Sequence, residues 1–210
     1  MSGEPAGPRS IPELPDLELP ALRLAPALLG VKLVRTDEDG VRRVGVIVET
    51  EAYPGGRDRA SHTSGGRRTP RTESMYLAGG HAYVYRIYGM HDCLNVVSGE
   101  ADSGEAVLIR AVRPEAGLEA MRKDRPGISD RDLARGPGRL CRAFAIDRGF
   151  DRVRFGAGQL VLEPGVVVRR AMITRAPRVG IDGAGSWAAR PWRFLFGDRR
   201  WWSAPPRKDA

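Results

Sequence analysis

The chain has 210 residues, of which 41% are hydrophobic, and this length and composition suit one globular domain able to bury a core of its own. Its 34 basic and 26 acidic residues leave a net charge of +8, which favours a polyanionic partner such as a nucleic acid or a membrane surface without deciding between them. Two cysteines, Cys93 and Cys141, are too few for a disulfide framework or a zinc site, and no apolar run approaches the ~20 residues of a membrane span.

The first half of the chain is predicted to be a tail followed by strands. Residues 1–20 contain five prolines and few apolar side chains, which predicts a flexible Pro-rich tail. A short helix is expected at 22–29. A loop rich in glycine and arginine spans 54–74, and structureless loops of this length are usually functional. The strands predicted in this half lie at 31–35, 41–50, 82–88, 93–98 and 106–112.

The second half adds two helices that each begin with a proline, at 114–123 and 137–146. Short strands are expected at 159–162, 166–170 and 192–196. Strands cluster and helices do not alternate with them, a pattern typical of α+β folds. We therefore expect a single compact domain with a mixed, largely antiparallel sheet, flanking helices and a protruding β-hairpin. Its expected bounds are 21–204, with 205–210 as a C-terminal tail.

Two carboxylates, Glu49 and Glu51, end the second predicted strand. They lie two residues apart, so both side chains point to the same face of the strand. Most pairs of this kind are solvated strand ends, and the pattern alone makes Glu51 only a candidate catalytic residue. Arg110 follows the apolar run 107–109, where an arginine either extends its charge to solvent or is aimed at an anion or a carboxylate.

Aromatic residues gather in the predicted hairpin. Tyr83 and Tyr85 share one face of its first strand, and Tyr88 falls at the turn before Gly89. An aromatic side chain at such a turn either packs against the protein or contacts another molecule, for example by insertion between base pairs. His62 lies in the arginine-rich loop, where stacking, hydrogen bonding and a plain surface position all remain open. The three histidines lack the spacing of metal ligands.

Taken in order, these segments resemble the alkyladenine (3-methyladenine) DNA glycosylase family of the mammalian type, from about Leu24 to about Ser203. The motifs that carry the resemblance are Glu49-Thr50-Glu51-Ala52-Tyr53, His62, Gly65-Gly66-Arg67, Thr69-Pro70-Arg71, Tyr83-Val84-Tyr85, Tyr88-Gly89-Met90, Asn95, Val107-Leu108-Ile109-Arg110-Ala111, Gly136-Pro137 and Arg178-Val179-Gly180.

The resemblance implies a base excision repair enzyme that binds double-stranded DNA containing damaged purines. Such an enzyme flips the damaged base out of the helix and hydrolyses its bond to the sugar without AP lyase activity. The implied substrates are 3-methyladenine, 7-methylguanine and ethenoadenine, with hypoxanthine as a further candidate. No metal and no organic cofactor are expected. We also expect a monomer without a membrane partner, located in the cytoplasm or, in a bacterium, with the nucleoid.

The resemblance also implies individual roles. Glu51 matches the general base that activates a water, and Arg110 helps to hold that water. Tyr88 and Met90 match residues that insert into DNA, and Asn95 crowds the 2-amino group of guanine. The residues implied in the base-binding pocket are Tyr53, Ala60, His62, Tyr85, Asn95 and Leu108. The residues implied to contact DNA phosphates are Arg67, Arg68, Arg71 and Arg139.

Three alternatives remain at this point. The first is a non-catalytic protein that binds damaged DNA on the same scaffold, the second is a nucleoside hydrolase, and the third is an enzyme directed at RNA, because phosphate contacts do not distinguish the two sugars. Some positions depart from the family pattern. Arg57 and Arg59 stand where the pattern is more acidic, and His91 stands where an aromatic residue is expected.

Overall fold

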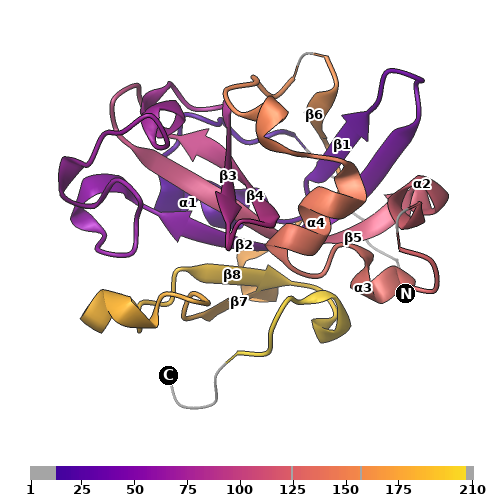
Figure 1. Ribbon diagram of the computed structural model, residues 1–210. Helices are drawn as coiled ribbons and strands as arrows, with labels where there is room; N and C mark the ends of the chain where they lie inside the picture. The colour runs from indigo at the N-terminus through magenta and orange to yellow at the C-terminus, as the bar shows by residue number, and fades with distance from the viewer. Residues whose placement is uncertain (1–12, 124, 157, 207–210) are drawn as a thin grey trace, which may run out of the picture.

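The computed structural model describes residues 13–123, 125–156 and 158–206, and its central feature is an eight-stranded sheet. The strands are β1 (Lys32–Thr36), β2 (Arg42–Tyr53), β3 (Ala82–Ile87), β4 (His91–Ser98), β5 (Glu105–Ala116), β6 (Leu160–Glu163), β7 (Ile173–Ala176) and β8 (Arg193–Phe196). Their order is β3-β4-β5-β2-β1-β6, and β8 joins β2 to β7 (Figure 1). Every pairing in the described part of the chain is antiparallel, so the predicted α+β class is confirmed.

Strand β2 is the centre of the sheet because three strands pair with it. One edge pairs with β1 over its first half and with β8 over residues 49–51, and the other edge pairs with β5. Register shifts on either side of Glu49 interrupt the β2–β5 ladder, and such irregularities bend a strand and redirect its side chains. Glu49 and Glu51 therefore lie where β5, β2 and β8 meet, and both are fully buried.

Helices pack against the sheet and complete the hydrophobic core. They are α1 (Ala21–Ala27), α2 (Leu118–Arg122), α3 (Asp130–Leu133) and α4 (Pro137–Phe144). Proline at the first position of α4 has the fixed φ that a helix start requires, and the helix buries Leu140, Cys141 and Phe144 against β4 and β5 (Figure 1). These side chains join Leu24 of α1 in one hydrophobic cluster, which forms the main core.

Short 3₁₀ helices occupy the loops. They are η1 (Gly55–Arg57), η2 (Ser64–Gly66), η3 (Glu73–Tyr76), η4 (Arg148–Phe150), η5 (Arg170–Met172), η6 (Asp182–Trp187) and η7 (Arg199–Trp201). The first three lie in the long loop that the sequence predicted between β2 and β3. Within the described residues, no helix has the length and apolar character needed to cross a bilayer.

The turn between β3 and β4 leaves two large apolar side chains in solvent. Tyr88 and Gly89 both have positive φ, 52° and 70°, as in the tight turns that match the twist of paired strands. Tyr88 is 82% exposed and Met90 is 71% exposed. A left-handed backbone is uncommon for a bulky residue, and here it directs Tyr88 away from the protein.

Several expectations for secondary structure are wrong. Residues 166–170 do not form a strand: after β6 the chain passes Pro164, and the amide of Val166 donates to Gly30 without a continuing ladder. Residues 114–116 extend β5 by pairing with residues 44 and 45, and the positive φ of Gly117 ends the strand before α2 begins. Neither β7 nor α3 was expected, because four-residue segments carry little periodicity.

Order begins earlier than the expected boundary at Ala21. Leu17 and Leu19 pack against the main core, and the carbonyl of Leu19 accepts a hydrogen bond from the amide of Gly99. Residues 13–20 are therefore part of the folded chain. The rest of the expected N-terminal tail, 1–12, and most of the expected C-terminal tail lie outside the described residues.

Candidate active site

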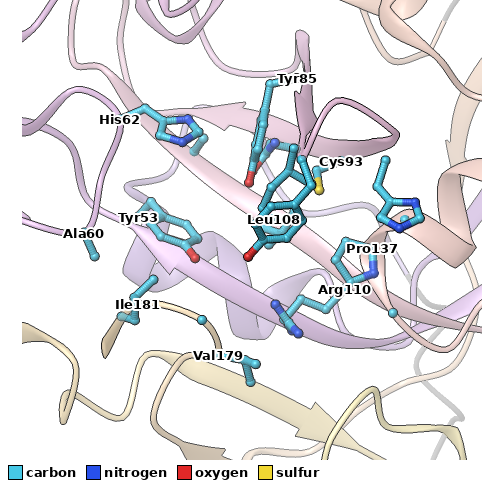
Figure 2. A pocket seen from close by; sticks show the side chains of 18 of the residues that line it. Tyr53, Ala60, His62, Tyr85, Cys93, Leu108, Arg110, Pro137, Val179 and Ile181 are labelled. Atoms are coloured by element: carbon cyan, nitrogen blue, oxygen red, sulfur yellow. The ribbon is translucent and has the colours of Figure 1, made fainter. Parts of the chain in front are cut away.

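A cavity of about 650 Å³ opens beside β2, β4 and β5. Its walls come from five places: the end of β2 with the loop that follows, the β3–β4 hairpin, β5, the start of α4, and the loop 179–181 after β7 (Figure 2). The sequence-predicted residues that line it are Tyr53, Ala60, His62, Arg71, Tyr85, Tyr88, Asn95, Leu108, Arg110 and Arg139. The structure therefore brings together every residue predicted for the base-binding pocket.

Aromatic rings form one side of the cavity. The His62 and Tyr85 rings meet edge to face, with centroids 4.6 Å apart, and Tyr83 lies behind them with its centroid 5.2 Å from that of Tyr85. Tyr83 is buried, and its hydroxyl lies 2.8 Å from Nδ1 of His62. Burial, reinforced by the charges of Arg71 and Arg67, lowers the pKa of His62 to about 4, so the imidazole is neutral at physiological pH.

The thiol and the phenol on this side are also uncharged. Burial raises the pKa of Cys93 to about 11, and burial raises the pKa of Tyr85 above its usual value, so thiol and phenol stay protonated. Asn95 is buried beside Leu108, its partner on β5, and its amide nitrogen donates to the carbonyl of Tyr83 at 3.0 Å. The amide oxygen and the second N–H of Asn95 remain for a ligand.

The main chain of the loop after β2 also contributes to the wall. The amide of Ala60 donates to Oδ1 of Asp58 at 3.0 Å, so only the carbonyl of Ala60 remains for a ligand. The amide of His62 has no hydrogen-bond acceptor among the residues that the structure describes. One acceptor and one donor of the main chain thus stand two residues apart on the cavity wall.

The carboxylate of Glu51 lies directly behind the wall. Glu51 is fully buried and does not itself line the cavity, but the three groups that bind it do. Its Oε2 accepts from the Tyr53 hydroxyl at 2.9 Å and from Nη1 of Arg110 at 3.3 Å, and its Oε1 accepts from the amide of Val179 at 2.7 Å. A carboxylate offers about four acceptor sites, so one site remains on Glu51.

Arg110 joins Glu51 to Glu49. Its Nε donates to Oε1 of Glu49 at 3.0 Å, while Nη1 reaches Glu51. Burial alone would lower the pKa of Arg110, but the charges of Glu51 and Glu49 raise it above its usual value, so the guanidinium stays charged. Glu49 also accepts from Nε of Arg193 at 2.8 Å and from the amide and hydroxyl of Ser203 at 2.5 and 2.7 Å. Its Oε1 accepts three hydrogen bonds and its Oε2 accepts one, so Glu49 is held from several sides and supports Arg110.

A second buried ion pair was not found from the sequence. Asp58 and Arg178 have fully buried side chains and share two hydrogen bonds, one of them 2.9 Å long. Arg178 occurs in a motif of the family resemblance, but nothing in a single sequence links it to a residue 120 positions away. Likewise, nothing in a single sequence links Arg193 or Ser203 to their partner Glu49. Only covariation among related sequences could have shown these partners.

The predicted phosphate-contacting residues lie in different surroundings. Arg71 lines the cavity, with its guanidinium carbon 5.4 Å from the centroid of the Tyr85 ring. Arg67 is exposed. Arg68 is already paired with Glu73 and Asp102, at 2.6 and 2.7 Å. Arg139, at the start of α4, is paired with Asp132 at 3.1 Å.

Metal ligands are not gathered anywhere in the described residues, where no group of three or more His, Cys, Asp or Glu side chains could hold an ion. The cavity brings together the buried Glu51 carboxylate behind its wall, aromatic rings, main-chain hydrogen-bonding groups and the guanidinium groups of Arg71, Arg110, Arg135 and Arg139.

Comparisons with known proteins agree with this arrangement. Residues 16–200 match the family model described as Methylpurine-DNA glycosylase. The chain is 47% identical over 187 residues to a putative 3-methyladenine DNA glycosylase of Myxococcus xanthus, covering 89% of this chain and 90% of the relative. It is 44% identical to the DNA-3-methyladenine glycosylase of Mus musculus over 200 residues, and 42% identical to that of Homo sapiens over 199 residues. Both matches cover 90% of this chain, but only 60% of the mouse protein and 66% of the human protein.

Proposed function

The chain belongs to the methylpurine-DNA glycosylase family, and we propose that it is a base excision repair enzyme that hydrolyses the bond between a damaged purine and its deoxyribose in duplex DNA. Relatives that match across most of this chain are named 3-methyladenine DNA glycosylases, which supports a glycosylase activity here. The single observation that carries the proposal is the buried Glu51 carboxylate, held by Tyr53, Arg110 and the amide of Val179 immediately behind an aromatic cavity.

In the proposed mechanism, Glu51 accepts a proton from a water that attacks the anomeric carbon of the flipped nucleotide. The remaining acceptor site of the carboxylate is where that water would bind. As the glycosidic bond breaks, the sugar gains positive charge, which a nearby carboxylate stabilises. Arg110 orients Glu51, because its guanidinium is shared between Glu51 and Glu49. The products are the free base and an abasic sugar in an intact strand.

The absence of an amine at the cavity supports hydrolysis without strand cleavage. An AP lyase forms an imine with the sugar, for which lysine is the usual side chain. Among the described residues, no lysine lines the cavity. Monofunctional action is therefore part of the proposal.

The cavity favours damaged purines for two reasons. Electron-rich rings of Tyr53 and Tyr85 attract cationic bases, so 3-methyladenine and 7-methylguanine suit this slot. The carbonyl of Ala60 and the amide of His62 complement an edge with one donor and one acceptor, as adenine derivatives present it. Ethenoadenine and hypoxanthine are neutral and depart less readily, so we propose them as slower substrates. Asn95 crowds the 2-amino group that undamaged guanine and 7-methylguanine share, and only 7-methylguanine carries the positive charge that the rings attract.

The exposed turn supplies the proposed DNA-distorting element. Tyr88 and Met90 would enter the duplex where the damaged nucleotide leaves it, because large apolar side chains inserted at a base step compensate for lost stacking. Arg67, Arg71 and Arg139 are proposed to contact phosphates. Arg68 has the same proposed role, but it would have to leave Glu73 and Asp102 to bind a phosphate.

Glu51→Gln tests the proposal. The variant keeps the shape of the side chain but cannot accept the proton, so base release in single-turnover assays should fall by about 10²–10⁴-fold while lesion DNA is still bound. Duplexes would carry 3-methyladenine analogues, ethenoadenine or hypoxanthine, and alkali would reveal abasic sites. The control is Glu163→Gln, in an exposed ion pair with Arg42, which should release base at the wild-type rate. Binding without release in the wild-type protein would instead support a non-catalytic damage-binding protein.

Three expectations stay predictions: the monomeric state, the cytoplasmic or nucleoid location, and the assignment of 21–204 as the catalytic domain. The described residues agree with one folded unit that begins before Ala21.

A further inference from the structure

We propose that the buried ion pair between Asp58 and Arg178 is a specificity-determining element that balances the charge behind the aromatic slot, so that cationic and neutral damaged purines can both be accepted. This inference rests on the proposed function. Neither residue lines the cavity, and both act through groups that do.

The Asp58–Arg178 ion pair first joins two segments of the chain that contribute to the cavity walls. Asp58 lies in the turn that follows η1, and Arg178 lies in the loop after β7. Among the described residues, no strand pairing joins these two segments. Asp58 binds Arg178 through both oxygens and also accepts from the amide of Ala60. Arg178 in turn donates to the carbonyl of Ala52 at 2.9 Å, and the next residue, Val179, holds Glu51.

The pair also places a positive charge behind Tyr53. The guanidinium carbon of Arg178 lies 4.6 Å from the centroid of the Tyr53 ring, and it lies 5.0 Å from the ring of Trp192. Tyr53 lines the cavity (Figure 2), whereas Arg178 does not, so the guanidinium acts on the slot through the Tyr53 ring. A ring that already has a cation on one face attracts a second cation less strongly on the other.

Asp58 offsets this effect. Its carboxylate is as deeply buried as the guanidinium and binds it directly, so a base in the slot is exposed to a paired charge rather than to a free cation. Removal of the Asp58 charge would leave an uncompensated cation one ring away from the bound base. In the poorly screened interior such a charge repels a cationic purine and leaves a neutral one nearly unaffected.

The test compares a cationic lesion, 7-methylguanine, with a neutral one, 1,N6-ethenoadenine, in the same duplex. Asp58→Asn should reduce the ratio of cationic to neutral base release by about tenfold, because one unpaired charge then faces the slot. Arg178→Gln should raise that ratio, and the double variant, with two neutral amides, should restore it to within about twofold of wild type. Asp37→Asn is the control, since Asp37 pairs with Arg43 away from the cavity.

Loss of packing alone would reduce release of both lesions together in every variant, and this outcome overturns the inference. An unchanged ratio of cationic to neutral base release in Asp58→Asn also overturns the inference. If Asp58→Asn does not fold, the opposite shift in Arg178→Gln decides. The same ratios would be measured as affinities for duplexes with 2′-fluoro nucleotides, which resist hydrolysis. A wild-type protein that releases no base defeats the proposed function, while the affinity ratios still support or refute the role of Asp58.

Discussion

Two regions of the molecule handle charge in opposite ways. The buried ionic wall behind the cavity contains three carboxylates and three guanidinium groups, all in direct contact with a partner of opposite charge. Its members are Glu49, Glu51, Asp58, Arg110, Arg178 and Arg193. The exposed rim in front of the cavity carries charged and apolar groups that face solvent or surface partners. Its members are Arg67, Arg68, Arg71, Tyr88 and Met90.

The difference follows from the cost of burying charge. A buried ion is tolerated only when partners satisfy it, so removal of one partner leaves another charge stranded. The ionic wall should therefore be rigid, and its residues should affect both stability and catalysis. Exposed ion pairs contribute about 0–1 kcal/mol, so the rim can be altered with little effect on folding. Under the proposed function, chemistry and DNA contact belong to parts of the protein with different tolerance to change.

The largest effect is expected for Glu49→Gln, which removes the shared partner of Arg110 and Arg193. Two buried guanidinium groups then lose their compensating charge, and the free energy of unfolding should fall by about 3–5 kcal/mol. Urea unfolding measures this loss. Glu163→Gln removes an exposed partner of Arg42 and should cost less than about 1 kcal/mol. Equal losses in the two variants would contradict the distinction between buried and exposed ion pairs.

The next effect concerns His62, which lies between the two regions. Its pKa is about 4 in the folded protein and 6.5 in a model peptide, so the neutral form favours folding. The resulting stability is fully present above pH 6.5 and is lost as the pH falls toward 4, with an upper limit of about 3 kcal/mol. Urea unfolding at a series of pH values checks this. His62→Asn should flatten the dependence in this range, and a slope that persists in the variant would contradict the assignment.

A smaller effect on folding but a clear effect on activity is expected at the rim. Tyr88→Ala should leave the melting temperature unchanged, because the side chain is 82% exposed. Base release from duplex DNA should fall by about 10–100-fold, since flipping costs a few kcal/mol that an inserted ring helps to offset. The same lesion opposite an abasic site has no base to pair with, so flipping costs less and the loss of base release should be smaller there. An equal defect on both substrates would argue against insertion.

The smallest effect separates two neighbouring arginines. Arg67→Ala should reduce the slope of log affinity against log salt by about 0.9, the contribution of one phosphate contact. Arg68→Ala should change that slope less, because its guanidinium is held by Glu73 and Asp102. Fluorescence anisotropy of labelled duplexes at several salt concentrations gives both slopes. Identical slopes for the two variants would show that the surface pairs of Arg68 do not restrain it.

Local pattern predicted only part of this site. Alternating apolar residues placed Glu49 and Glu51 on one face of β2, and both indeed reach Arg110. The pattern alone left open whether Tyr88 packs against the protein or is exposed, and the pocket role of Tyr85 came from the resemblance to the glycosylase family. A single sequence displays the spacing within one segment directly, but it does not display the role of a side chain.

Contacts between distant segments could not be predicted. Asp58 meets Arg178 across 120 residues and Glu49 meets Ser203 across 154, and no local periodicity encodes such partners. The strand expected at 166–170 has suitable residues, but the amide of Val166 donates to the carbonyl of Gly30 and not to a neighbouring strand. The burial of Glu51 behind Tyr53 likewise depends on packing of β8 beside β2.

The contact between Glu49 and Ser203 has a consequence for protein synthesis. A ribosome that adds about 5–20 residues per second needs roughly 8–30 seconds to extend the chain across the 154 residues between these positions. During that interval the nascent polypeptide lacks the hydroxyl and amide that complete the coordination of Glu49. A chain that ends before residue 203 would lack the amide and hydroxyl donors that complete the hydrogen bonds of Glu49.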